Sequence, residues 1–371
     1  MNKKQNGNYG KLAAFFLVAV IFLCICGVAA SGWQAEDPNE PDSGDVVPDE
    51  DDGADENTDG TEKPSDTTPE IYLPKHVNPI TGVECSAEEA TRGHLAFIFD
   101  SSAPTYGLSS SDVLIEFPTE HGATRLLAFI SDSEKLGKIG SLAPTRGYIS
   151  NLIRPFGAPL VALGSDDSVS YEHYDLSASV LDLSQSVGYH YTEYSHFNYS
   201  NGHLIKAGLS NVRPAAPAEG VSLPFVFTQF GENPVTGNTP ALKVTIPYSV
   251  GSETELTYSV ESGGVYVFSK NGVPKTDMLT GTYTGFENVI VLFADSVTYE
   301  TAKSTQTVMN THTSGSGYYL TEGTSSYITW SVDEGGIYHF SDENGSPLTV
   351  NRGKTYIGFV KSSMTDAVKF Q

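Results

Sequence analysis

The segment Asp112–Ser131, DVLIEFPTEHGATRLLAFIS, decides how the chain folds. Val113, Ile115 and Phe117 alternate with Asp112, Leu114 and Glu116, which is the period-2 pattern of a half-buried strand. Residues 118–122 carry turn signals, and Thr124–Ile130 reads as a second strand. The segment therefore predicts a β-hairpin.

Charged residues on this hairpin form the first candidate site. Folding it about its central loop places Glu116 opposite Arg125, with Asp112 on the same face as Glu116. Two neighbouring carboxylates could divide acid and base roles. The alternative is a cross-strand ion pair of little functional meaning. Glu120 is the strongest carboxylate candidate, because functional residues concentrate in loops.

The charge distribution separates a tether from a folded part. The 371-residue chain has a formal net charge of −24, and residues 33–70 contain 15 acidic residues against one lysine, Lys63. This stretch has almost no aliphatic side chains, so we expect a disordered, extended linker. No basic field is present elsewhere, which argues against nucleic acid as a partner.

Residues 1–32 are predicted to be an export signal or membrane anchor. Three lysines precede Leu12–Ala30, a run of 19 residues without charge. We expect this segment to be retained or lipidated rather than cleaved, with the bulk of the chain extracytoplasmic. The lipidation candidates are Cys24 and Cys26, although both follow large residues. Cys85 is then alone in the exported part, which excludes an intrachain disulfide there.

The remaining sequence predicts an α+β fold in two domains. Residues 71–223 combine strands at 94–100 and 159–163 with the hairpin, a short helix after the turn at 140–144, and a helix within 168–186. Residues 224–371 predict a mostly antiparallel β domain, with Asn-Gly turns at 271–272 and 344–345. Its predicted strands are 241–248, 255–260, 264–268, 288–293, 327–332, 336–340 and 355–360.

Motifs in both domains resemble the YerB-like family of bacterial predicted lipoproteins, which has two adjacent domains of unknown function. In the first domain the matching positions are Gly107, Leu108, Ser109, Asp112, Glu116, Glu120, Thr124, Arg125, Gly140 and Arg146. NPITG at 78–82 and HFNYSNGHL at 196–204 are also similar to family segments. In the second domain the matches are NGVPKTD at 271–277, ENVIVL at 287–292, YITW at 327–330 and NRGKTYI at 351–357.

The chain departs from the family pattern at basic positions. Ala143 stands where the family turn has its first arginine, and Tyr191–Glu193 replaces an arginine before the histidine-containing segment. A basic residue expected near Phe268 is also missing. If the family holds an anionic ligand through these groups, the resemblance implies weaker binding here. It implies no specific activity, because the family's function is not established.

Arg146 and the histidines complete the set of candidates. Arg146 lies at the head of the predicted short helix, where it suits an anion or pairs with Asp112 or Glu116. His196 is retained as a ligand-binding candidate with Thr124. The spacings among the histidines at 190, 196 and 203 match no standard metal site, so no metal or cofactor is expected. Nor does the Gly-Ser-Gly run at 315–317 have the helix and lysine of a phosphate loop.

Two functional hypotheses follow from the sequence. The preferred one is a membrane-tethered, extracytoplasmic binding or interaction protein of the bacterial cell envelope. Its partner would be an envelope protein or an anionic glycan or lipid. The alternative is an envelope enzyme acting on a polymer or lipid-linked anionic precursor, with Glu116 or Glu120 as acid and base and Arg125 and Arg146 as anion clamp. No complete catalytic constellation is present in the sequence, which favours the first hypothesis.

Overall fold

The structure is a computed structural model, which describes residues 73–164, 180–185, 190–191, 198–199, 224–300 and 305–371. The residues from Leu73 onward belong to one compact unit, Thr67–Gln371. Helix within these described ranges is limited to α1 (Ala87–Thr91), α2 (Ile149–Ile153) and short 3-10 stretches. None of these helices has the length and apolarity to cross a membrane. The described fold is therefore largely β, and the expected α+β character of the first half is present only in part.

One large sheet takes strands from both halves of the sequence. Its order is β20 (Tyr338–Ser341), β19 (Thr324–Val332), β18 (Ser314–Thr321), β15 (Asn288–Ala294), β22 (Thr355–Lys361), β2 (Val113–Pro118), β3 (Thr124–Ile130), β1 (Leu95–Asp100), β4 (Leu160–Ala162) and β5 (Val180–Asp182). The halves join where β2 pairs with β22. This pairing is parallel, as is that of β15 with β22, so the β-rich segment is less uniformly antiparallel than expected.

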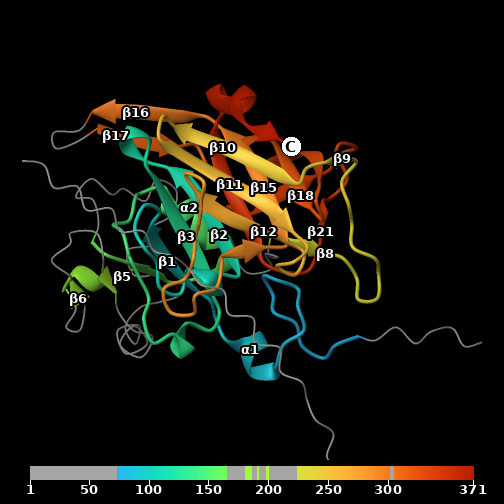
Figure 1. Cartoon of the computed structure of the whole chain (residues 1–371), viewed down its shortest axis with the longest axis horizontal. Helices are drawn as coiled ribbons and strands as arrows, with labels where there is room; N and C mark the ends of the chain where they lie inside the picture. The colour runs from blue at the N-terminus through green and yellow to red at the C-terminus, as the bar shows by residue number, and fades with distance from the viewer. Residues whose placement is uncertain (1–72, 165–179, 186–189, 192–197, 200–223, 301–304) are drawn as a thin grey trace, which may run out of the picture. The chain divides into compact units, whose positions relative to one another are not determined.

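A second sheet stacks on one face of the large one (Figure 1). Its order is β13 (Val273–Pro274), β12 (Val265–Lys270), β11 (Ser252–Ser259), β10 (Lys243–Ser249) and β23 (Lys369–Phe370), with β14 (Gly285–Phe286) beside β12. Leu114 and Leu126 of the large sheet share a core cluster with Ile246 and Phe268 of the second. Apolar burial between the two sheets holds them together.

The remaining described strands are short or paired outside these two sheets. They are β6 (His190–Tyr191) with β7 (Asn198–Tyr199), β8 (Val226–Phe227) with β21 (Thr349–Val350), β16 (Ser296–Glu300) with β17 (Thr305–Met309), and β9 (Thr239–Pro240) beside β19.

A second core covers the opposite face of the large sheet. Phe117 and Phe129 pack there with Leu152 of α2 and with Phe156, whose ring centroid lies 4.2 Å from that of Phe129. Every residue of β2 is buried as a result. The half-buried strand predicted from the alternation is therefore wrong: β2 is a central strand covered on both faces.

The turn chemistry of the hairpins follows the sequence closely. Strands β2 and β3 form the predicted hairpin. Asn271 and Gly272 have φ values of +50° and +75°, and they join β12 to β13 as the Asn-Gly pair predicts.

Two other expectations are corrected. Val180–Leu181 lie in β5 rather than in the predicted helix 168–186, because β4 offers a parallel partner that outweighs the helical periodicity; residues 168–179 lie outside the described ranges. Strand β18 was not predicted because glycines break its pattern. A side chain at Gly315 or Gly317 would clash with a carbonyl oxygen of β15, so close strand approach explains both glycines.

Because one sheet spans both halves, we predict that Leu114→Ala lowers the stability of the whole unit. Leu114 is fully buried in β2, and its truncation should cost about 2–5 kcal/mol through lost burial and a residual cavity. Chemical denaturation of the full-length protein in a non-ionic detergent, followed by tyrosine fluorescence, measures the loss. Val297→Ala at an exposed site is the matched control. Two separate transitions, of which only one shifts, would contradict the prediction.

Candidate functional site

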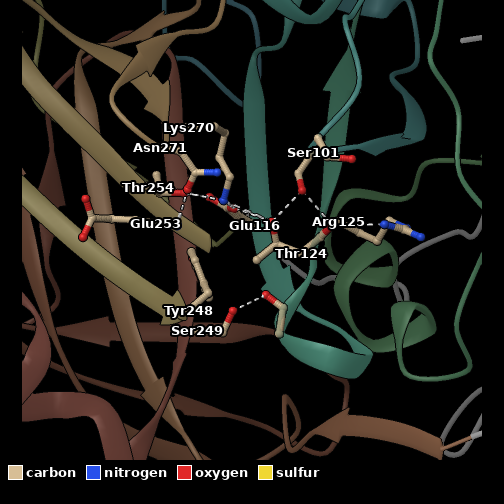
Figure 2. Close-up of polar contacts among 12 residues, drawn as sticks. Ser101, Glu116, Thr124, Arg125, Tyr248, Ser249, Glu253, Thr254, Lys270 and Asn271 are labelled. Atoms are coloured by element: carbon tan, nitrogen blue, oxygen red, sulfur yellow. Dashed lines mark hydrogen bonds and ion pairs between the residues drawn. The ribbon is translucent and has the colours of Figure 1, made fainter. Parts of the chain in front are cut away.

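The carboxylate of Glu116 lies fully buried between the two sheets and receives four hydrogen bonds. Oε1 accepts from Lys270 Nζ and from Thr124 Oγ1, each at 2.7 Å. Oε2 accepts from Thr254 Oγ1 and from Tyr356 Oη, also at 2.7 Å. Figure 2 shows Glu116 with its partners Lys270, Thr124 and Thr254. Both oxygens of this carboxylate have hydrogen-bond partners, which is the condition for burying a charged group inside a protein.

Lys270 is the counter-charge of Glu116 and comes from the second sheet. Its side chain is 8% exposed, and Nζ also lies 2.9 Å from Thr254 Oγ1 and 5.2 Å from the centroid of the Tyr248 ring. Burial first, and then the charge of Glu116, raises the pKa values of Tyr248 and Tyr356 well above the ordinary 10. Both tyrosines therefore act as neutral hydrogen-bonding groups, and the network ties β2 and β3 to β11, β12 and β22.

Arg125 lies on the face of β3 opposite to the Glu116 network. It stands across from Phe117, one position away from the predicted partner Glu116. A one-residue shift in register moves a side chain to the other face of a sheet, so the expected Glu116–Arg125 pair is wrong. The Arg125 guanidinium instead donates from Nη1 to Thr124 O at 3.2 Å and approaches Asp100 Oδ1 at 3.9 Å.

Glu120 and Arg146 bind each other. Arg146 donates from Nε to Glu120 Oε1 at 3.1 Å and from Nη2 to Oε2 at 2.9 Å, in a two-pronged pair whose side chains are about 15% exposed. Burial would raise the pKa of Glu120, but the hydrogen bonds and charge of Arg146, with the Thr307 backbone, lower it. Arg146 thus fastens the segment before α2 to the hairpin tip. Its partner is neither Asp112 nor Glu116, contrary to the pairing considered from the sequence.

Asp112 belongs to a different part of the surface. It accepts a hydrogen bond from the backbone of Ser131 at 2.9 Å and lies 3.8 Å from Nε2 of the buried His94. It lines a cleft of about 350 Å³ together with Glu84, Cys85, Glu287 and Lys354. The structure therefore separates Asp112 from Glu116, although Asp112 directly precedes the strand that carries Glu116. His196, Cys24 and Cys26 lie outside the described residues.

A larger cleft opens beside the buried network and takes its walls from both halves of the chain. Its volume is about 550 Å³, within the range of small-molecule sites. Three cations, Arg125, Lys270 and Lys275, line it with one carboxylate, Asp100. Its other lining residues are mostly small and polar: Ser101, Ser102, Gly122, Ala123, Thr124, Ser249, Val250, Gly251, Ser252, Asn271 and Val273.

Lys275 is a cation of this cleft whose pKa is clearly lowered. Burial, and then the neighbouring charge of Lys270, lowers its pKa to about 8, while Asp100 and Glu116 oppose the shift. Its Nζ donates to the backbone oxygen of Ala103 at 2.9 Å. Binding of an oxyanion beside this ammonium would therefore be favourable.

Of the predicted site residues, the cleft contains Thr124 and Arg125 but none of the three carboxylate candidates of the hairpin segment. Lys270 and Lys275 were missed from the sequence, and the expectation that no basic residue lies near Phe268 is wrong, because Lys270 follows Phe268 by two positions. One signal could have found Lys270: it follows Tyr266 and Phe268 at two-residue spacing, so it shares their buried face of β12. No local pattern identifies Lys275, whose position depends on contacts with residues about 170 positions earlier.

Comparison with known proteins gives two kinds of match. Residues 80–214 match the family described as protein of unknown function (DUF3048), N-terminal domain, and residues 244–357 match its C-terminal domain. The crystal structure of YerB protein from Bacillus subtilis is similar with a TM-score of 0.67, at 19% identity, over 80% of this chain and 100% of that chain. At this identity the likeness concerns the fold. No curated protein matches the chain.

The buried pair generates a prediction about stability. Glu116→Gln leaves the Lys270 ammonium buried without its counter-charge and should cost about 3–5 kcal/mol. Combining it with Lys270→Met should cost less than the two single changes together, because neither charge is then left alone. Urea denaturation of the four proteins measures the coupling.

The control for this cycle is a less buried pair on the second sheet. Lys243 and Glu255 have side chains 30% and 19% exposed, and Lys243→Met should cost no more than about 1 kcal/mol. Additive losses at Glu116 and Lys270 would show that the pair is not coupled.

Proposed function

The chain belongs to the YerB-like family, as its motifs predicted, and from its own geometry we propose that it is a binding protein for an anionic ligand. The family's description as a protein of unknown function assigns no activity, so the proposal depends on the cleft. The excess of cations lining this cleft is the observation that carries it.

The donors in the cleft suit an oxyanion. The Arg125 guanidinium carries five N–H groups, of which Nε is buried without a hydrogen-bond partner among the described residues. Lys275 approaches from the other half of the chain, and its pKa is lowered by burial and by the neighbouring charge of Lys270. Charged hydrogen bonds of this kind are stronger than neutral ones.

The location in our proposal comes from the sequence. The uncharged run Leu12–Ala30 after three lysines, followed by the acidic linker 33–70, supports a membrane-tethered protein whose folded unit lies outside the cytoplasm. Such a tether would hold the cleft near ligands of the bacterial cell envelope.

The contacts give less support to the enzyme alternative. Its acid and base candidates are already paired, Glu116 with Lys270 and Glu120 with Arg146. Neither carboxylate lines the cleft that contains Arg125. A binding function uses the residues that do line it and requires no rearrangement of these pairs.

The first prediction of this proposal concerns affinity. Arg125→Gln and Lys275→Gln should each weaken the binding of a small oxyanion at least about tenfold, since a hydrogen bond to a charged group contributes about 1.5–3 kcal/mol. Calorimetric titration of the full-length protein in a non-ionic detergent, with dimethyl phosphate and acetate as probes, measures the change. Lys135→Gln, with a side chain 68% exposed and remote in sequence, is the control. Absence of binding by both probes would contradict the proposed function.

The second prediction concerns pH. Burial and the charge of Lys270 lower the pKa of Lys275 to about 8, and a bound anion would favour its protonated form. Affinity should therefore be highest below pH 8 and weaken by up to about tenfold per unit above it, until the raised pKa of the complex is passed.

Titrations at several pH values test this dependence. Lys275→Arg keeps the positive charge at all these pH values, so it should bind the probes with little change between pH 7 and 9. An equally steep loss in this variant would show that another group controls the binding.

A further inference from the structure

The rim of the anion cleft carries an apolar feature that an inorganic anion would not use. Val250 and Val273 line the same cleft as the cations, and their relative exposures are 107% and 66%. Val250 occupies the turn between β10 and β11, where polar residues and glycine are favoured. Val273 follows the Asn271–Gly272 turn directly. Two exposed valines, one in a turn and one directly after the neighbouring turn, thus border one polar cavity.

The strand pairing explains why these two turns are neighbours. β11 pairs with both β10 and β12, and the backbone of Asn271 donates to Glu253 O at 2.9 Å. Single exposed apolar residues are ordinary, but two exposed valines that line one cavity indicate a binding surface.

The charges that surround the cleft define the ligand's own charge. Arg125, Lys270 and Lys275 line it, Asp100 lines it beside Arg125, and the buried Glu116 neutralises Lys270. Three cations against two carboxylates leave one positive charge. A monoanion, such as a carboxylate or phosphodiester, balances it, whereas a dianion would leave negative charge in excess.

From these observations we infer that the cleft takes an amphiphilic monoanion, whose oxyanion lies between Arg125 and Lys275 and whose alkyl part covers Val250 and Val273. The inference rests on the proposed anion-binding function and adds the ligand's class. The small polar residues of the wall can contact the polar head group of such a ligand. The valines can contact the first methylene groups of its alkyl chain. Burial of the valines against an alkyl group supplies the additional affinity.

The experiment compares short and longer monoanions on the full-length protein in a non-ionic detergent. Dimethyl and dibutyl phosphate form one series, and acetate and hexanoate form the other; all are soluble, and partition into detergent is corrected with a protein-free blank. Each buried methylene strengthens binding by up to about fourfold. Dibutyl phosphate or hexanoate should therefore bind at least about tenfold more tightly than its short counterpart. Which series gains more identifies the head group as phosphodiester or carboxylate.

Two variants assign this gain to the rim. Val250→Ser with Val273→Ser should reduce the chain-length gain to less than about threefold while leaving the affinity for the short probes unchanged. Val260→Ser is the matched control, because Val260 is 78% exposed but does not line the cleft. The valines are exposed, so the double variant should keep its fold, which its thermal unfolding verifies.

The possible failures are distinguishable. If the short anions bind but neither longer one gains, the apolar rim has no role and the inference is overturned while the proposed function stands. An undiminished gain in the double variant also overturns it. If no probe binds to the wild type, the proposed function and the inference fall together.

Discussion

A carboxylate buried in the centre of a protein needs a counter-charge and hydrogen-bond donors. In this fold the buried carboxylate is that of Glu116, and strands from both sheets supply its partners. Its strand lies in the middle of the large sheet, while Lys270 and Thr254 reach it from the second sheet and Tyr356 from β22. Dehydration of the ion pair offsets much of its attraction, so its net contribution to stability is modest. Its geometric demand is strict, because each of these strands must be in register for the charges to be satisfied. We regard the pair as a device that specifies how the sheets stack.

Features encoded over a few neighbouring residues were predictable from the sequence. The hairpin of β2 and β3 follows from alternation and turn residues, and Asn271–Gly272 forms the turn that this dipeptide favours. The face of Arg125 was not predictable, because a shift of one residue in the hairpin register reverses it. Pairings such as that of β2 with β22 depend on segments far apart, for which a single sequence contains no local signal.

The candidate site illustrates the same limit. The charged residues of the hairpin were identified, but their partners were not. The sequence therefore did not show that Glu120 and Arg146 form an ion pair with each other. Arg125 keeps a role in the proposed cleft because its nearest carboxylate remains 3.9 Å away. The decisive contribution of Lys275 comes from a wall that only the assembled fold creates. Charge in the sequence thus indicated the region, and packing determined which charges remain available to a ligand.

The parallel pairing of β2 with β22 also has consequences for when the chain can fold during synthesis. It bears as well on how the two family segments are inherited. Glu116 and Tyr356 are 240 positions apart, so the pairing of β2 with β22 can form only after the C-terminal part of the chain has been synthesised. Until then β2 exposes an unpaired edge and an uncompensated carboxylate, a state open to wrong association. A chain exported as we propose would benefit from crossing the membrane before it folds. We likewise expect the two family segments to be inherited together in one chain, since either one alone would lack the strands that complete its sheet.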